Sequence, residues 1–339
     1  MKRKVLIFAS IIPVFLFVSG AFILENRSSI YNGSSFSDKI NFLDIFSKKQ
    51  EVKKEESVKM LFFGDLMLDR DVKARLRQDG MEYILGGLQK ENFFSGYDII
   101  SANLEGTVTN DGKYYWPEKQ FDFAFLPEDV LKLKKYGFNF FNVANNHSYD
   151  QGRKGVAETE ENLKNMGYNF SGCMDGSVGG CSSTVLNIKD KKVGMAGFSI
   201  FGAFDLNKAE DIIFELDKIA DIIAVNIHWG DEYKTKHNEY QEKIAHGLID
   251  AGADIIIGHH PHVVEDIEEY KGKYIFYSLG NFIFDQYFSD EVKTGLAVAA
   301  EFKENDIFIK LEPIISNWIA VSLVNENKKK EILEKIAYP

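Results

Sequence analysis

The sequence predicts an α/β protein, and three features of its 339 residues indicate this class. From residue 58 onward, short apolar runs alternate with amphipathic stretches, which is typical of strands and helices joined into a largely parallel sheet. A polar motif directly follows each of the first five apolar runs. Toward the C-terminus, apolar runs follow one another with little helix between them, which indicates a second, more antiparallel sheet packed on the first.

The expected elements follow from these runs. The five predicted strands of the parallel sheet are Val58–Phe63, Asp98–Ala102, Phe138–Val143, Ile222–Ile227 and Ile255–Ile257. Those of the second sheet are Tyr274–Ser278, Leu296–Phe302 and Ile307–Ile315. Helices are predicted over Pro127–Tyr136, Val156–Met166, Asp211–Ile219 and Asn238–Ala251. Pro127 suits the first turn of a helix, and the acids that follow it favour the positive end of the helix dipole.

The net charge excludes one class of partner. Lys and Arg total 40 against 51 Asp and Glu, so the formal net charge is −11. Sequence-independent nucleic-acid binding needs a cationic surface. We therefore expect no nucleic-acid partner.

The N-terminus predicts a membrane segment. Met1–Lys4 is basic, and Val5–Leu24 carries no charge over a length that spans a bilayer as a helix. The basic flank stays cytoplasmic, so a single-pass protein with its C-terminal domain outside the cytoplasm is expected. A cleaved signal peptide is the alternative, because Ser19–Ala21 offers small residues near a cut site. We favour the retained anchor, because the run is longer than a usual signal core.

The predicted domains are an anchor or signal peptide over 1–24, a polar linker over 25–57 and a folded domain over 58–339. In the oxidising compartment that this topology implies, Cys173 and Cys181 are expected either to close a short disulfide or to remain as two free thiols.

The polar motifs predict a metal site. Ligands of α/β proteins bind at the carboxyl ends of parallel strands, where the loops converge. Imidazole and carboxylate ligands together suit Zn, Mn or Fe, and an oxygen-rich half-site suits Mg or Mn. The side chains that five loops deliver to this edge are Asp65, Glu105, Asn146, His147, His228, His260 and His262.

Other polar residues receive smaller expected roles. His147 is expected to be a ligand neighbour or, with Asn146, part of the catalytic group as the acid that protonates a leaving group. Asp150 is expected to cap the following helix. His237 and His246 are expected to be structural. Residues that are candidates for the pocket or for packing are Asn103, Asn281, Trp229 and the Trp116-Pro117 pair.

Taken in order, the motifs resemble the CapA-type poly-gamma-glutamate capsule biosynthesis family. The matching blocks are Gly64–Leu68, Asn103–Gly106, Ala144–His147 with Asp150, His228–Gly230, Gly258–His262 and Tyr277–Phe282. The resemblance covers about residues 58 to 295. It implies a four-layer α/β/β/α sandwich of the calcineurin-like metallophosphoesterase type.

The resemblance also implies ligand roles. Asp65 and Glu105 would be metal ligands, and His262 would bind the first ion. If two ions are bound, Glu105 would bridge them. The second ion would take Asn146, His228 and His260. The chain departs from the metallophosphoesterase pattern at Met67, where that group has a histidine, and at Glu105, where it has an aspartate. One ion or two therefore both remain open.

Two functions follow. In the first, the protein is a metal-dependent hydrolase at the cell surface whose substrate is a phosphoester or the gamma-glutamyl polymer. In the second, it is a non-catalytic metal- or polymer-binding component of a capsule synthesis or export complex, with other subunits as partners.

Overall fold

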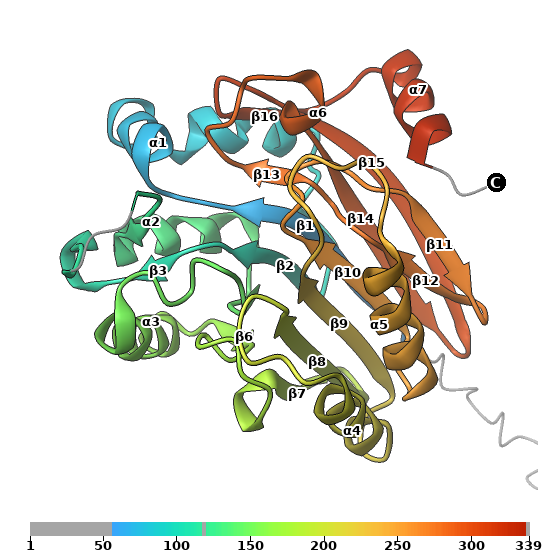
Figure 1. Ribbon diagram of the computed structural model, residues 1–339. Coiled ribbons are helices and arrows are strands. Elements are labelled where there is room, and N and C mark those ends of the chain that lie inside the picture. Colours follow the sequence, from blue (N-terminus) through green and yellow to red (C-terminus); the bar gives the residue numbers. More distant parts are fainter. Residues whose placement is uncertain (1–55, 117–119, 337–339) are drawn as a thin grey trace, which may run out of the picture. The chain divides into compact units, whose positions relative to one another are not determined.

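The computed structural model describes residues 56–116 and 120–336 (Figure 1). The predicted membrane segment over 1–24, the predicted linker as far as residue 55 and Pro117 lie outside the described residues. Among the helices that are described, none combines the length and the apolar character needed to cross a membrane.

The larger sheet joins strands from both ends of the domain. Its order is β16-β15-β14-β1-β2-β5-β6, and β13 also pairs with β1. The strands in chain order are β1 Val58–Leu66, β2 Ile99–Leu104, β5 Phe140–Asn142, β6 Asn169–Ser171, β13 Asn281–Ile283, β14 Thr294–Lys303, β15 Asp306–Asn317 and β16 Ala320–Leu323. The neighbouring strands β1, β2, β5 and β6 pair in parallel. Strands β14, β15 and β16 are antiparallel to their neighbours.

The second sheet is built from the middle of the chain, in the order β11-β12-β10-β9-β8-β7. Its strands are β7 Ser183–Ile188, β8 Lys191–Ser199, β9 Ile222–His228, β10 Ile255–His259, β11 Ile267–Tyr270 and β12 Lys273–Phe276. A small separate pair consists of β3 Thr107–Val108 and β4 Ala124–Phe125.

The predicted strands all occur, but their predicted division between two sheets is wrong. β9 and β10 were expected beside β1 and instead lie in the second sheet, while β14 and β15 join β1. The pair Val58↔Phe302 shows why local sequence could not decide this, because its partners are far apart along the chain. An apolar run predicts a buried strand without indicating which strand it will pair with.

Helices cover the outer faces of the sheets, as Figure 1 shows: α1, α2 and α3 lie on the side of β1 and β2, and α4 and α5 on the side of β8 and β9. The helices are α1 Arg70–Lys90, α2 Pro127–Leu131, α3 Gly152–Asn165, α4 Leu206–Asp217, α5 Glu239–Asp250, α6 Asp290–Lys293 and α7 Glu326–Ile336. The predicted helix over Pro127–Tyr136 is α2 continued by a 3₁₀ turn.

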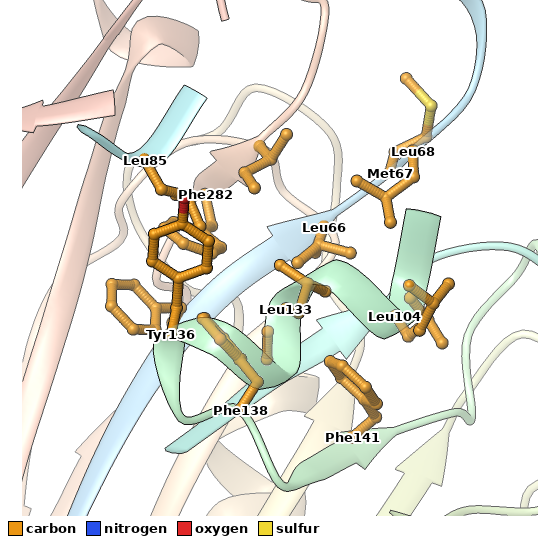
Figure 2. Close-up of a cluster of buried hydrophobic side chains, with 14 of the residues drawn as sticks. Leu66, Met67, Leu68, Leu85, Leu104, Leu133, Tyr136, Phe138, Phe141 and Phe282 are labelled. Carbon is orange, nitrogen blue, oxygen red and sulfur yellow. The ribbon is translucent and has the colours of Figure 1, made fainter. Parts of the chain in front are cut away.

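Three apolar clusters show the order of the layers. On β1, Leu61 and Phe63 belong to the same buried cluster as Leu85 of α1 and Leu133 of the 3₁₀ turn. Figure 2 shows Leu85 and Leu133 within this cluster. The alternate residues, Met60 and Phe62 among them, pack against the second sheet at Ile222, Ala224, Ile255 and Ile257. A third cluster lies between the second sheet and α4 and α5. This alternation is the period of two that a strand buried on both faces requires, and it gives a helix–sheet–sheet–helix arrangement.

Candidate metal centre

The candidate site lies at the carboxyl ends of strands from both sheets. In the larger sheet, Asp65 of β1 lies in register with Asn103 of β2. In the second sheet, His228 at the end of β9 lies in register with His259 at the end of β10. Aligned parallel strands bring their following loops to one edge. The expected convergence therefore occurs, although two sheets rather than one supply the loops.

Asp65 is a completely buried carboxylate held by three groups. Oδ1 accepts from Asn103 Nδ2 at 2.8 Å, and Oδ2 accepts from the His260 backbone N–H at 3.2 Å. Oδ2 also lies 3.3 Å from His262 Nδ1. Burial raises the pKa of Asp65, but the hydrogen bond and positive charge of His262 more than offset it and hold the pKa below its usual range. Asp65 is therefore ionised.

Glu105 is also fully buried, and neither of its carboxylate oxygens has a hydrogen-bond partner among the described residues. Oε1 lies 3.7 Å from His262 Nε2 and 3.9 Å from His147 Nε2. Burial, together with the charge of Asp65, raises the pKa of Glu105 well above its usual value. An unpaired buried carboxyl group is costly. This orphaned carboxylate beside imidazole nitrogens fits a divalent cation.

His260 and His262 flank Pro261 in an unusual backbone conformation. Their backbone φ angles are 99° and 57°, values that residues other than glycine rarely adopt. Such strain is concentrated at functional sites. The charges of Glu105 and Asp65 outweigh burial and raise the pKa of His262 to about 9. Its Nδ1 lies 2.9 Å from Asn281 Oδ1, so that Nδ1–H donates there and Nε2 faces Glu105.

Asn103 connects the two sheets within the site. Its Nδ2 donates to Asp65 Oδ1 and lies 3.2 Å from His228 Nδ1. The other ring nitrogen of His228, Nε2, lies 2.9 Å from Asn146 Oδ1. Burial and the neighbouring His260 lower the pKa of His228 well below its usual value, and burial lowers that of His260 to about 4. Both rings are thus neutral, as metal ligands must be, whereas His262 would have to release a proton on binding an ion.

Among the residues that the structure describes, two groups of His, Asp and Glu side chains have ligand atoms close enough to share an ion. One is Asp65, Glu105 and His262, and the other is Glu232, His260 and His262; within each group the atoms lie within 4.8 Å of one another. Sequence reasoning missed Glu232, which lies four residues after His228 on the loop that follows β9. The only local signal for it was its position just beyond the His228-Trp229-Gly230 motif.

His147 lies at the same edge but has a different neighbour. Nδ1 lies 2.7 Å from Asp150 Oδ2, and the ring packs on Phe123 with 4.3 Å between centroids. The expected cap by Asp150 is wrong, because α3 begins after Gln151 without a side-chain cap. Asp150 instead accepts from His147 and from the Phe123 backbone N–H, at 3.0 Å.

Three further candidates lie away from the metal ligands. Trp229 is fully buried in the core, where its indole N–H donates to the Tyr277 carbonyl at 2.8 Å. His237 stacks on Tyr277 and His246 on Tyr270, at 3.8 and 3.7 Å between centroids. These contacts are structural.

Met67 belongs to the core. Its side chain is fully buried in the cluster that Figure 2 shows, and its sulfur accepts from the Asp69 backbone N–H at 3.0 Å. The chain therefore has no ligand at the position where the metallophosphoesterase pattern has a histidine.

Cys173 and Cys181 form a disulfide. The loop that it closes packs against the segment following β8, where a Cβ on Gly176 would lie 2.9 Å from the Gly202 Cα. Next to Gly202, Phe201 packs on the His260 ring with 4.2 Å between centroids. The disulfide loop therefore supports one wall of the site.

The fold and the site define a mixed α/β protein with a candidate divalent-metal centre. The chain belongs to the family described as bacterial capsule synthesis protein PGA_cap, which it matches over residues 59–286. This confirms the resemblance to CapA-type proteins, whose fold is of the calcineurin-like phosphoesterase type.

Similar proteins include two from Bacillus. The chain is 33% identical over 254 residues to the capsule biosynthesis protein CapA of Bacillus anthracis, covering 69% of this chain and 61% of that one. It is 35% identical over 249 residues to the PGA biosynthesis protein CapA of Bacillus subtilis, covering 66% and 63%. The chain thus spans less than two thirds of each relative. A solved structure assigned as a 5′-nucleotidase of Staphylococcus aureus, in complex with alpha-ketoglutarate, has a TM-score of 0.44 at 14% identity, covering 83% of this chain and 58% of that one.

Proposed function

We propose that this protein is a metal-dependent hydrolase that acts in poly-gamma-glutamate capsule synthesis at the cell envelope. Its substrate would be a phosphoester or the gamma-glutamyl polymer itself. Membership of the capsule synthesis family and similarity to the two Bacillus proteins support the biological setting. The single observation that carries the chemistry is the orphaned buried carboxylate of Glu105 between His147 and His262.

The donor set assigns roles to the residues of the chain. Asp65, Glu105 and His262 would hold an ion, and Asn103 orients both Asp65 and His228. A bound divalent ion would polarise a phosphoryl or carbonyl oxygen of the substrate and acidify a water molecule. Asp150 holds the proton of His147 on Nδ1, which leaves Nε2 to exchange a proton with the substrate.

The acidic chain raises the question of how it would meet an anionic polymer. With a net charge of −11, the protein repels a polyanion unless cations offset that charge locally. A divalent ion between protein carboxylates and polymer carboxylates would provide the offset. Metal is therefore expected to be needed for polymer binding as well as for cleavage.

The alternative is a non-catalytic component that binds metal or polymer for other capsule-synthesis subunits. The burial of Met67 in the core favours it, because the pattern of the catalytic superfamily is incomplete at that position. The disulfide supports an extracytoplasmic location under either proposal. The membrane anchor over 1–24 remains part of the proposal, and the N-terminal residue of the mature protein would test it.

The deciding experiment uses the purified full chain in detergent. Bound metal is measured by elemental analysis, and hydrolysis is measured on a generic phosphodiester and on poly-gamma-glutamate of defined length. We expect His262→Ala to lose metal and hydrolysis together, and His147→Asn to lose hydrolysis while keeping metal. His246→Asn serves as the control, because His246 stacks on Tyr270 away from the site.

Two results would count against the proposal. Unchanged metal content in His262→Ala would show that the site is wrongly placed. Metal binding without hydrolysis of either substrate, whichever divalent ion is supplied, would favour the non-catalytic component.

A further inference from the structure

Arg70 is a cationic residue beside the candidate metal centre, and the proposed function assigns it no role. It is the first residue of α1, and its guanidinium carbon lies 4.9 Å from the Phe123 ring centroid and 5.6 Å from that of Phe284. Both of these buried rings pack on the site. Phe123 lies 4.3 Å from the His147 ring and Phe284 lies 4.8 Å from the His262 ring, between centroids. The guanidinium is therefore separated from each of these two histidines by a single aromatic ring.

The backbone and Asp285 together hold Arg70 in this place. Its φ angle is 49°, a value that residues other than glycine rarely adopt and that is concentrated at functional sites. Its Nε–H donates to Asp285 Oδ2 at 3.1 Å, and its Nη2 donates to Asp285 Oδ1. The backbone N–H of Asp71 donates to the same Oδ2 at 3.2 Å. The guanidinium is thus fixed relative to the loop that follows β13.

The contacts of Arg70 leave part of the guanidinium available to a ligand. A guanidinium has five N–H donors in a planar fork, and Asp285 accepts from one on Nε and one on Nη2. The other three have no hydrogen-bond partner among the described residues, and the side chain is 35% exposed. An arginine that binds one carboxylate along one edge of the fork can bind a second anion along the other edge.

The acidic character of the protein gives these donors a use. Asp65 and Glu105 are carboxylates, and the whole chain has a net charge of −11, so an anionic substrate is repelled wherever a bound ion does not reach it. A simple phosphoester carries its charge at the bond that would be cleaved. A gamma-glutamyl chain carries a further carboxylate on every residue. Because Arg70 lies one ring away from the candidate metal centre, it is suited to an anionic group beside the reacting one.

We propose that Arg70 is a specificity-determining residue that binds a side carboxylate of the gamma-glutamyl polymer, next to the unit held at the metal centre. Asp285 occupies one edge of the guanidinium and the polymer carboxylate the other. This role rests on the proposed function, within which it selects the polymer over a simple phosphoester. Arg70 takes no part in breaking the bond.

The test compares two ligands by calorimetry on the full chain in detergent, loaded with Mn²⁺ and then freed of excess ion. One ligand is a short gamma-glutamyl oligomer, and the other is the same oligomer with its side carboxylates converted to amides. The unaltered protein should prefer the carboxylate form. In Arg70→Met this preference should fall by at least about tenfold, the scale of a charge-assisted hydrogen bond, and Arg70→Lys should recover part of it.

Arg75→Met is the matched control. Arg75 lies on the same helix, donates to Asp79 at 2.7 Å and lies over the Tyr83 ring at 4.8 Å. It therefore has the same two kinds of contact as Arg70, and its removal should leave the preference for the carboxylate oligomer unchanged.

The outcomes separate this role from the proposed function. If Arg70→Met weakens both oligomers equally or leaves the preference unchanged, Arg70 only fastens α1 to Asp285 and the proposal is wrong. An unaltered protein that binds neither oligomer, or both equally, also overturns it. Binding is read without turnover, so a fall in preference in a protein that hydrolyses nothing supports the role of Arg70 while the hydrolase proposal fails. Hydrolysis of the polymer with an unchanged preference in Arg70→Met has the opposite meaning.

Discussion

His147 lies between two acids of different character: its Nδ1 is 2.7 Å from Asp150 Oδ2, and its Nε2 is 3.9 Å from Glu105 Oε1. Asp150 is bonded to the ring on the side away from Glu105 and fixes which nitrogen carries the proton. An orienting carboxylate of this kind sets the tautomer of a histidine without touching the substrate. Asp150 is thus a positioning residue in the proposed mechanism.

Asp150→Asn is therefore expected to lower kcat by at least about tenfold while metal content stays unchanged, because an amide at this position can hold the wrong tautomer. The pH profile of kcat should shift as well, which a merely structural role would not cause. The control is Asp266→Asn, which alters another aspartate–histidine pair, at 3.1 Å from His237. An unchanged kcat and pH profile in Asp150→Asn would show that Asp150 does not position His147.

Glu105→Gln is expected to make the metal-free protein more stable and to abolish most of the stabilisation that metal provides. The substitution replaces a buried carboxyl group, whose charge is opposed by burial and by the charge of Asp65, with a neutral amide, and we expect the unfolding free energy in chelator at neutral pH to rise by about 1–3 kcal/mol. Metal at 100 times its Kd should stabilise the unaltered protein by about 2.7 kcal/mol and the variant hardly at all. Urea unfolding with chelator and with Mn²⁺ measures both effects. Equal stabilisation of both proteins by metal would exclude Glu105 as a ligand.

The disulfide is expected to contribute to stability and to the shape of the site. Replacing both cysteines by serine opens a loop with a sequence separation of 8, and chain entropy predicts a loss of about 2.5 kcal/mol in unfolding free energy. Because the loop supports the segment that carries Phe201, the affinity for metal should also fall. Denaturant unfolding with and without a reducing agent checks the prediction. The reductant should destabilise the unaltered protein and leave the double variant unchanged; if it affects neither, the bond makes no contribution.

Glu265 is expected to make stability depend on pH. Burial raises the pKa of this carboxyl group from 4.5 to about 8, against the opposing hydrogen bond from Gln241. The folded protein therefore holds this proton more tightly than the unfolded chain does. The resulting contribution is fully present below pH 4.5 and is lost as the pH rises through about 8.

Glu265→Gln should remove this part of the pH dependence, which we expect to be on the order of a few kcal/mol. Urea unfolding at pH 5 and pH 8 of the unaltered protein, Glu265→Gln and the exposed control Glu269→Gln provides the comparison. The same fall in stability between the two pH values in all three proteins would assign it to other groups.

Gly64 lies where the backbone of β1 meets the loop before β13. A Cβ at this position would lie 1.8 Å from the Gly280 carbonyl oxygen, the atom that accepts from the Asp65 backbone N–H at 3.0 Å. Gly64→Ala should therefore lower the unfolding free energy by more than about 4 kcal/mol, because the backbone at Gly280 must move to make room for the added methyl group. Gly86→Ala in α1 is the control: no atom lies within 4 Å of its added Cβ, and it should stabilise by about 0.5–1 kcal/mol. Similar stabilities of the two variants would contradict the close approach.

Much of the site could be predicted because its chemistry is local in the sequence. Asp65, Glu105, His228 and His260 each directly follow or end an apolar run, and a strand's length and period locate its carboxyl end. Helix α1 was missed for an equally local reason: Gly80, with φ 75° and ψ 175°, breaks the helix, so its buried residues do not keep one helical phase. Strands β7 and β8 were also missed, and β7 is only partly buried.

The sequence by itself determined the strand-end motifs, the family and most of the candidate ligands. The tertiary structure decided which strands share a sheet, since β14 pairs with β1 although the two strands lie far apart along the chain. It also decided that Asp150 orients His147 instead of capping α3, and that Glu232 lies beside His260. Periodicity reports the environment of one segment, whereas strand pairing and loop–loop hydrogen bonds join segments distant in the chain. Only the folded protein brings such segments into contact.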